Sequence, residues 1–316
     1  MCDSIYLGVS VVFPLLFYMM IGVAVKKLGW VSDKTLAEMN RLVFRVLMSV
    51  MVFLNAYTID IGSAFSRENV KVLLLCIAAM AAIFFAAVIG CRKFVREKTR
   101  KAVLIQGIYR SNLALFGLPV STAICGEGNL STISILIAVI VPIFNIIAAI
   151  LLNWAKDSNS SVGGISIMAF TNPLVFGSVL GLACSLINLP LAELILTPLT
   201  GLSKAATPLA FIVLGGSLVV ESIKKDLKSI FCVCLIRLVL VPCVVLGGAI
   251  AMGICGPPLV AMMVVFASPI AVSSYTMAKE MEVSPDLAGE LVAVTTIISM
   301  ITMFMWIAVL DFCKYI

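Results

Sequence analysis

Long apolar stretches dominate this chain and limit it to folds that cross a lipid bilayer. A bilayer core of about 30 Å needs about 20 apolar residues for one helical span. Stretches of that kind lie at 5–25, 36–57, 70–90, 102–124, 131–153, 171–188, 204–221, 229–252, 258–280 and 288–310. Hydrophobic residues make up 62% of the chain and charged residues 12%, which excludes an ordinary soluble domain. The sequence predicts an all-α membrane protein with ten transmembrane helices.

A weak internal repeat links the first span to the sixth. Pro14 in the first span is matched by Pro173, which lies 159 residues later. Gly22 is matched by Gly181 at the same offset. Internal repeats of this kind are common in transporter folds.

The repeat divides the chain into two halves of five spans. We expect one repeat over 1–154, a hydrophilic linker over 155–170 and a second repeat over 171–316. Because each half has an odd number of spans, the second half enters the membrane from the opposite side. The fold expected is therefore a 5+5 inverted repeat.

Lysine and arginine are concentrated in the loops after the odd-numbered spans, which sets the expected orientation. The segment 92–101 after the third span is the richest example. Since basic loops stay in the cytoplasm, we expect both termini outside the cell, the central linker inside and a plasma-membrane location. The net charge of +6 is spread over these loops, so it does not indicate a nucleic-acid partner.

The chemistry of the chain excludes several functional classes. The chain has no histidine, which removes histidine-based metal sites and catalytic triads. Its ten cysteines lie mostly inside spans, where cysteine behaves as a small hydrophobic residue. We expect no enzyme activity, no metal and no cofactor.

Two polar segments interrupt the apolar pattern, one in the fourth span and one in the ninth. The fourth span carries Asn112, followed by Gly117, Leu118 and Pro119. The ninth carries Ala267-Ser-Pro269 and, farther on, Ala278-Lys-Glu280. Proline breaks the helical hydrogen-bond ladder, so we expect the helices to be broken around Pro119 and Pro269.

With these motifs the chain resembles the auxin efflux carrier family over its whole length. It lacks the long cytoplasmic loop of the plant carriers, as bacterial members do, and has Ser49 and Ser274 where prolines are usual. The resemblance implies that broken spans 4 and 9 cross, an arrangement shared with bile acid carriers and sodium–proton antiporters. It also implies a substrate bound beside the crossing, and a homodimer.

Polar groups around the two breaks are the candidate substrate site. Half-helix N-termini favour a carboxylate, and amide and hydroxyl side chains can add hydrogen bonds. Simple helix packing is the alternative for the serines, and an interhelical hydrogen bond is the alternative for the asparagine. The candidates are Asn112, Gly117, Pro119, Ser268, Pro269, Ser273 and Ser274, with Asn55 and Asn145 as weaker ones.

Three arginines lie within spans, whereas the carboxylates stay near span ends. Arg45, Arg110 and Arg237 either line an anion vestibule or extend to the cytoplasmic interface. Proton-coupled carriers commonly use carboxylates buried in the membrane, so this distribution argues against proton antiport and favours an anionic substrate.

The function expected is secondary transport of a small organic anion by alternating access around spans 4 and 9. Monocarboxylates, dicarboxylates and indole acids all fit this expectation. The alternatives are a sodium-coupled organic-anion symporter resembling bile acid carriers, and a membrane sensor that does not transport. Sodium dependence separates the two carriers, and the absence of flux would indicate the sensor.

Overall fold

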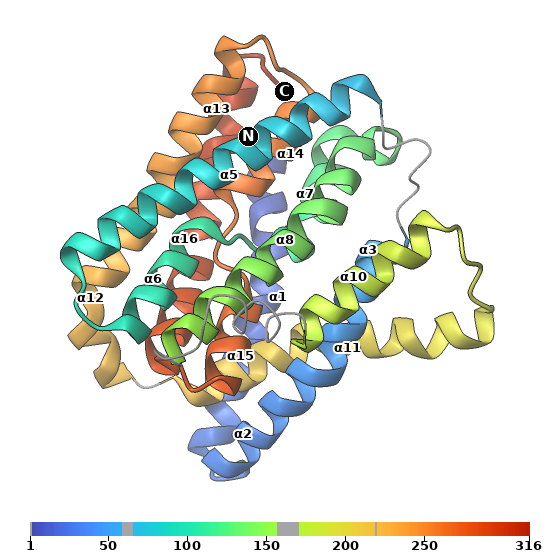
Figure 1. The fold of residues 1–316 in the computed structure, drawn as a ribbon. Helices are drawn as coiled ribbons and strands as arrows, with labels where there is room; N and C mark the ends of the chain where they lie inside the picture. The colour runs from blue at the N-terminus through green and yellow to red at the C-terminus, as the bar shows by residue number, and fades with distance from the viewer. Residues whose placement is uncertain (1, 59–65, 157–170, 219) are drawn as a thin grey trace.

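A computed structural model describes residues 2–58, 66–156, 171–218 and 220–316, and its regular elements over these ranges are helices (Figure 1). The first part comprises α1 (Cys2–Lys27), α2 (Asp33–Leu42), α3 (Met48–Tyr57), α5 (Arg67–Phe94), α6 (Lys98–Tyr109), α7 (Leu113–Cys125) and α8 (Ser131–Lys156). The second comprises α10 (Pro173–Leu186), α11 (Glu193–Ser217), α12 (Val220–Leu235), α13 (Val241–Ala251), α14 (Pro257–Ala267), α15 (Val272–Glu280) and α16 (Pro285–Phe312).

Some neighbouring helices are parts of one continuous rod. The π-helical segment Val43–Leu47 joins α2 to α3, and a second one, Ile236–Leu240, joins α12 to α13. A short 3₁₀ turn, Glu127–Asn129, precedes α8. Of the expected linker 155–170, the first two residues belong to α8 and the rest lie outside the described residues.

Several helices have the length and apolar composition that a bilayer span requires. Five qualify among the described residues, namely Arg67–Phe94, Ser131–Lys156, Glu193–Ser217, Ile223–Ala251 and Pro285–Phe312. The helices α7, α10 and α14 are apolar but shorter. The chain is therefore a multi-pass helical membrane protein, while the count of ten spans stays a prediction.

One expected span begins earlier than its apolar pattern indicated. The sequence predicts a span over 204–221, but α11 starts at Glu193. Polar residues such as Thr197 and Ser203 lower the hydropathy of this stretch without stopping the helix. Lys204 consequently lies in the middle of a long helix and not at its start.

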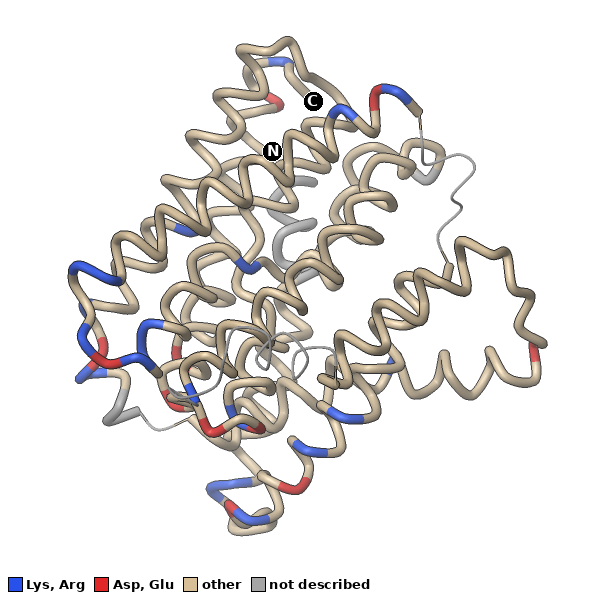
Figure 2. The backbone as a smooth tube through the Cα atoms, in the orientation of Figure 1, with Lys and Arg blue, Asp and Glu red and all other residues tan. Residues whose placement is uncertain are grey.

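Charged residues gather at one end of the molecule, which we call the charged end. Figure 2 shows them where α2, α15 and the first turns of α6 and α12 lie. Arg100 and Asp226 form an ion pair there, with 2.5 Å between nitrogen and oxygen. The hydrogen bond that Arg100 donates to the Asp226 carboxylate raises the pKa of Arg100 above its ordinary value. This clustering is what the loop charges predicted, and which side of the membrane it faces stays a prediction.

Two helix pairs pack so closely that only glycine fits at the contact. A Cβ added to Gly22 of α1 would lie 2.0 Å from the carbonyl oxygen of Ile212 in α11. A Cβ added to Gly181 of α10 would lie 2.2 Å from the carbonyl oxygen of Phe53 in α3. Gly181 follows Gly22 by 159 residues, and Ile212 follows Phe53 by the same number. Each residue of the first contact thus has a counterpart in the second contact, 159 residues away in the sequence.

The helix pairs around Gly22 and Gly181 should not tolerate alanine. Gly22→Ala and Gly181→Ala each force a methyl group against rigid backbone, and overpacking of this kind costs about 1–3 kcal/mol. We expect a lower thermal midpoint of unfolding in detergent. Gly90→Ala is the matched control, because a Cβ there meets open space. An unchanged midpoint for Gly22→Ala would contradict the packing.

Candidate functional site

Two helix interruptions lie side by side at the centre of the molecule. The chain leaves helical geometry between α6 and α7, at Arg110–Asn112, and again between α14 and α15. The backbone N–H of Asn112 donates to the carbonyl oxygen of Pro269 at 2.8 Å. Ser111 and Ile270 form an isolated antiparallel bridge beside this bond. Two helices therefore end at this place and two begin there.

The first interruption differs from the one that the prolines indicated. Pro269 lies within the second interruption, but Pro119 is inside α7, two turns after the first. Proline removes one helical hydrogen bond, that to the carbonyl group four residues earlier, which here belongs to Leu115. Leu115 and Pro119 both line a large cavity. The helix α7 continues through Pro119 to Cys125, so the break lies before it.

Arg237 binds the carbonyl ends of both interrupted helices. Its guanidinium group donates to the carbonyl oxygens of Val265 and Ser268 in and after α14, at 2.9 and 3.2 Å. It also donates to Ile108 and Tyr109 at the end of α6, both at 3.4 Å. Arg237 is 0% exposed. This arginine thus stabilises the two breaks and does not face the charged end.

The opposite ends of the breaks face a small enclosed space, which we call the inner cavity. It has a volume of about 30 Å³ and is lined by residues of α3, α7, α8, α11 and α15 together with Arg110, Ser111 and Asn112. Arg110 is 1% exposed and donates to the Asn145 side-chain oxygen at 2.6 Å and to the Ser273 hydroxyl at 2.8 Å. No aspartate or glutamate is among the described residues that line this cavity.

Asn112 adds an unused hydrogen-bond donor to the inner cavity. It is the N-cap residue of α7, and its side-chain nitrogen is buried with no hydrogen-bond partner in the described part of the chain. A buried amide without a partner costs about 1–3 kcal/mol. Arg110 is likewise a buried cation whose named partners, Asn145 and Ser273, are neutral. Both groups would be stabilised by an anion.

The remaining predicted residues are spread around this centre. Ser274 is buried, and its hydroxyl has no hydrogen-bond partner among the described residues. The Ser268 hydroxyl instead donates to the Val264 carbonyl oxygen within α14. Gly117 allows α7 to approach α8, because an added Cβ would lie 2.7 Å from Ile137. Gly117 and Ser268 therefore pack helices and do not line the inner cavity.

Arg45 lies apart from the other two arginines, at the charged end. Its side chain is 60% exposed and forms an ion pair with Glu280 of α15 at 2.7 Å. Arg41 lies 3.9 Å from the same carboxylate. Nearby, the side-chain nitrogen of Asn40 donates to the carbonyl oxygen of Thr276 at 3.2 Å. These contacts join α2 and the following π-helical segment to α15.

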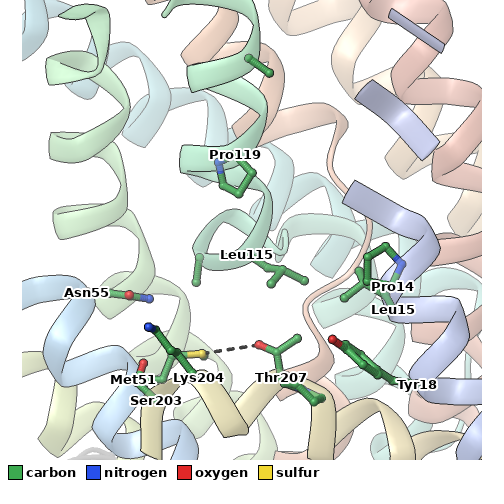
Figure 3. Close-up of a pocket in the computed structure, with 13 residues that line it drawn as sticks. Pro14, Leu15, Tyr18, Met51, Asn55, Leu115, Pro119, Ser203, Lys204 and Thr207 are labelled. Atoms are coloured by element: carbon green, nitrogen blue, oxygen red, sulfur yellow. Dashed lines mark hydrogen bonds between the residues drawn. The ribbon is translucent and has the colours of Figure 1, made fainter. Parts of the chain in front are cut away.

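A larger outer cavity adjoins the inner one, and Figure 3 shows the residues that line it. Its volume is about 600 Å³, and its walls are α1, α3, α7 and α11. The two cavities share the lining residues Met51, Ala114, Leu115 and Thr207. The Thr207 hydroxyl and the Met51 sulfur, which both border the two cavities, lie 3.8 Å apart. The outer cavity is thus an approach to Arg110 and Asn112 from the end opposite the charged one.

Sequence reasoning did not single out Thr207 and Met51, which line both cavities. Neither belongs to a motif, and a threonine or methionine in an apolar helix is ordinary. The nearest signal was Pro208, a span residue that also lines the outer cavity. Glu290 was expected near a span end, and it is buried at the start of α16, 1% exposed.

Part of the chain matches a known family of membrane proteins. The membrane transport protein family matches residues 159–307, which include α10 to α15 and most of α16. This match covers slightly less than half of the chain and indicates a membrane transporter. The family expected from the motifs is thereby confirmed, and the chain is a membrane transporter by family. A comparison with curated proteins gave no match.

Within this transporter, Arg237 should be needed for folding. Arg237→Met keeps much of the side-chain volume but leaves buried carbonyl groups of two helix ends without a donor. We expect a loss of about 3 kcal/mol in the free energy of unfolding. Thermal unfolding in detergent would measure it, with Arg92→Met at the exposed end of α5 as the control. Equal stability of the two variants would show that Arg237 is not structural.

Proposed function

We propose that this membrane transporter is a secondary carrier of organic anions that binds a substrate carboxylate in the inner cavity. The observation that carries the proposal is Arg110, a buried cation in a cavity whose described lining residues include no aspartate or glutamate. A buried charge is costly unless it is paired, so an entering carboxylate would gain the interaction that the protein itself does not supply. Asn112 would donate a further hydrogen bond from its free amide.

Two helix N-termini strengthen the same preference. The first N–H groups of a helix have no acceptor within the helix, and the N-terminus carries a partial positive charge. Asn112 is the N-cap of α7, and Val272 is the first residue of α15, and both line the inner cavity. Ser273 beside them offers its hydroxyl. These groups together suit the oxygen atoms of a carboxylate.

The architecture that we propose is a 5+5 inverted repeat, with 1–154 and 171–316 as its halves and broken spans 4 and 9 crossing at their interruptions. The two glycine contacts with their common offset support the repeat. The chain ends also lie at the same end of the molecule in Figure 1, away from α2. Since basic loops are cytoplasmic, the charged end would face the cytoplasm and the termini the outside of the plasma membrane.

The transport mechanism that we propose is alternating access. The outer cavity leads to Arg110 from the outside, while contacts of α15 close the cytoplasmic side. Those contacts are the ion pair between Arg45 and Glu280, and the bond of 2.6 Å from Lys279 to Ser217 in α11. Breaking them and closing the outer cavity would expose the same site to the cytoplasm. A site with an open cavity on one side and separable contacts on the other supports a carrier over a non-transporting sensor.

Sodium coupling is less favoured by the contacts at the breaks. A sodium site between broken helices would use backbone carbonyl oxygens that the breaks release. Here the carbonyl oxygens of Ser268 and Pro269 already accept hydrogen bonds from Arg237 and Asn112. We therefore propose a carrier driven by the gradient of its anion and by the membrane potential. A homodimer remains an expectation from the family.

The inner cavity can be tested with one nearly isosteric change. Asn112→Asp places a carboxylate beside Arg110, where it would compete with the substrate anion. We expect the uptake of labelled carboxylates into proteoliposomes to fall at least about tenfold, which is the scale of a lost hydrogen bond to a charged group. The thermal stability of the protein should be unchanged. Asn188→Asp, in the exposed loop between α10 and α11, is the control. Uptake equal to that of the control would refute the site.

The contact between Arg45 and Glu280 should bias the carrier toward the outward-open form. Glu280→Gln removes an ion pair whose arginine is largely exposed, worth up to about 1 kcal/mol. We expect faster hydrogen–deuterium exchange of α15, by up to about fivefold at this energy. Glu282→Gln, two residues on and exposed, is the control. Identical exchange in the two variants would show that the ion pair between Arg45 and Glu280 does not hold α15 in place.

A further inference from the structure

A cluster of cations without acidic partners lies at one side of the charged end. Nine lysines and arginines fall within 92–101, where α5 leads into α6, and within 224–228, in the first turns of α12. Figure 2 shows basic residues gathered at these places. The ion pair of Arg100 with Asp226 joins the two segments, and among the described residues Arg100 is the only one of the nine in a salt bridge. We call the other eight the basic patch: Arg92, Lys93, Arg96, Lys98, Lys101, Lys224, Lys225 and Lys228.

The basic patch differs from the cations beside α2, which have acidic partners. There, Arg41 and Arg45 both lie within ion-pair distance of the Glu280 carboxylate. The basic patch has one acidic residue within 92–101, namely Glu97, and this carboxylate already accepts a hydrogen bond from the Thr99 hydroxyl. All members of the patch except one are exposed. The patch therefore presents positive charge that the described part of the protein does not neutralise.

Exposed apolar side chains continue the basic patch along α12. Residues three and four positions apart lie on the same face of a helix. Four exposed residues of α12 have this spacing, namely Lys224, Leu227, Lys228 and Phe231. Leu227 is 56% exposed and Phe231 68%, and Leu235 extends the same face by one turn with 42% exposed. This face of α12 is thus cationic at the charged end and apolar farther along the helix.

The end of α5 has the same order of apolar and basic residues. Phe85 and Ile89 are exposed on one face of α5, and Arg92 follows Ile89 on that face by three residues. Phe94, the last residue of the helix, is 80% exposed, and the Lys93 Nζ atom lies 5.5 Å from the centre of its ring. Aromatic residues at the level of the cations are typical of the interface between membrane and water. Both helices therefore present cations at the level of lipid headgroups and apolar side chains at the level of acyl chains.

We propose that the basic patch binds anionic phospholipids of the membrane leaflet at the charged end. The lipid phosphate accepts hydrogen bonds from lysine and arginine side chains, and its acyl chains lie along the exposed faces of α5 and α12. The apolar part of these faces favours a lipid over a soluble anion, which would gain nothing from Phe231 or Leu235. No member of the patch lines the inner or the outer cavity, so this inference does not depend on the proposed substrate.

The test is a binding titration of the purified protein in a neutral detergent with fluorescently labelled phosphatidylglycerol, which is anionic, or phosphatidylcholine, which has no net charge. We expect the wild-type protein to bind phosphatidylglycerol more tightly. The double variant Lys224→Gln/Lys228→Gln should bind phosphatidylglycerol about fivefold more weakly for each charge removed, the scale of one basic residue at an anionic lipid surface. Its binding of phosphatidylcholine should be unchanged.

The double variant Lys27→Gln/Lys34→Gln is the matched control, because both lysines are exposed near α2 at the charged end and lie outside the basic patch. Its affinity for phosphatidylglycerol should equal that of the wild-type protein. Equal weakening in the two double variants would overturn the proposal, because it would show only the general attraction of a basic surface. Equal affinity of the wild-type protein for both lipids would overturn it as well. Displacement of phosphatidylglycerol by inorganic phosphate would replace the lipid by a soluble anion.

Discussion

The centre of the molecule depends on the hydrogen bonds that Arg237 donates to backbone carbonyl oxygens. By binding carbonyl groups at the ends of both α6 and α14, Arg237 keeps two helix C-termini at one place within an apolar interior. Partial negative charges that would otherwise repel each other are offset by one guanidinium group. Because these helices end together, α7 and α15 also begin together, and their positive ends face the inner cavity. The position of the candidate site thus follows from a buried structural arginine.

Arg110 has the same chemistry as Arg237 but a different environment. Arg237 donates to backbone carbonyl oxygens, which carry partial negative charge, and is thereby stabilised. The Asn145 and Ser273 partners of Arg110 are neutral side chains that orient its guanidinium group without cancelling its charge. The protein therefore offers a fixed, oriented positive charge beside a space of about 30 Å³. This arrangement favours binding of a small anionic group over a neutral one.

The apolar pattern predicted where the helices lie, but not how the breaks form. The span expected at 131–153 corresponds to α8, Ser131–Lys156, because the bilayer alone sets the length of such a stretch. The break expected at Pro119 lies instead at Arg110–Asn112, where the chain pairs with Pro269 and Ile270. That pairing joins residues more than 150 positions apart, so no local pattern could indicate it. Local propensity was overridden by tertiary contact.

The sequence also could not separate the three arginines. Arg45, Arg110 and Arg237 lie at similar depth in their predicted spans, and depth was the only property that the sequence supplied. In the structure one is exposed at the charged end, one borders the inner cavity and one is buried against helix ends. What distinguishes them is the distant partner of each, namely Glu280, Ser273 and Ser268.

Packing differs between the parts of the molecule that the proposed mechanism would move against each other. The pairs of α1 with α11 and of α3 with α10 meet through glycines at backbone contact, and such surfaces cannot slide without separating. Between these helices and α7 lie the outer cavity and the flexible side chain of Met51, which can repack when the walls approach. At the charged end, α15 meets α2 and α11 through polar and ionic contacts, including the bonds of Asn40 and Lys279. The proposed alternating access would move one group of helices as a unit, and it requires this combination of tight packing within a group and separable polar contacts at its boundary.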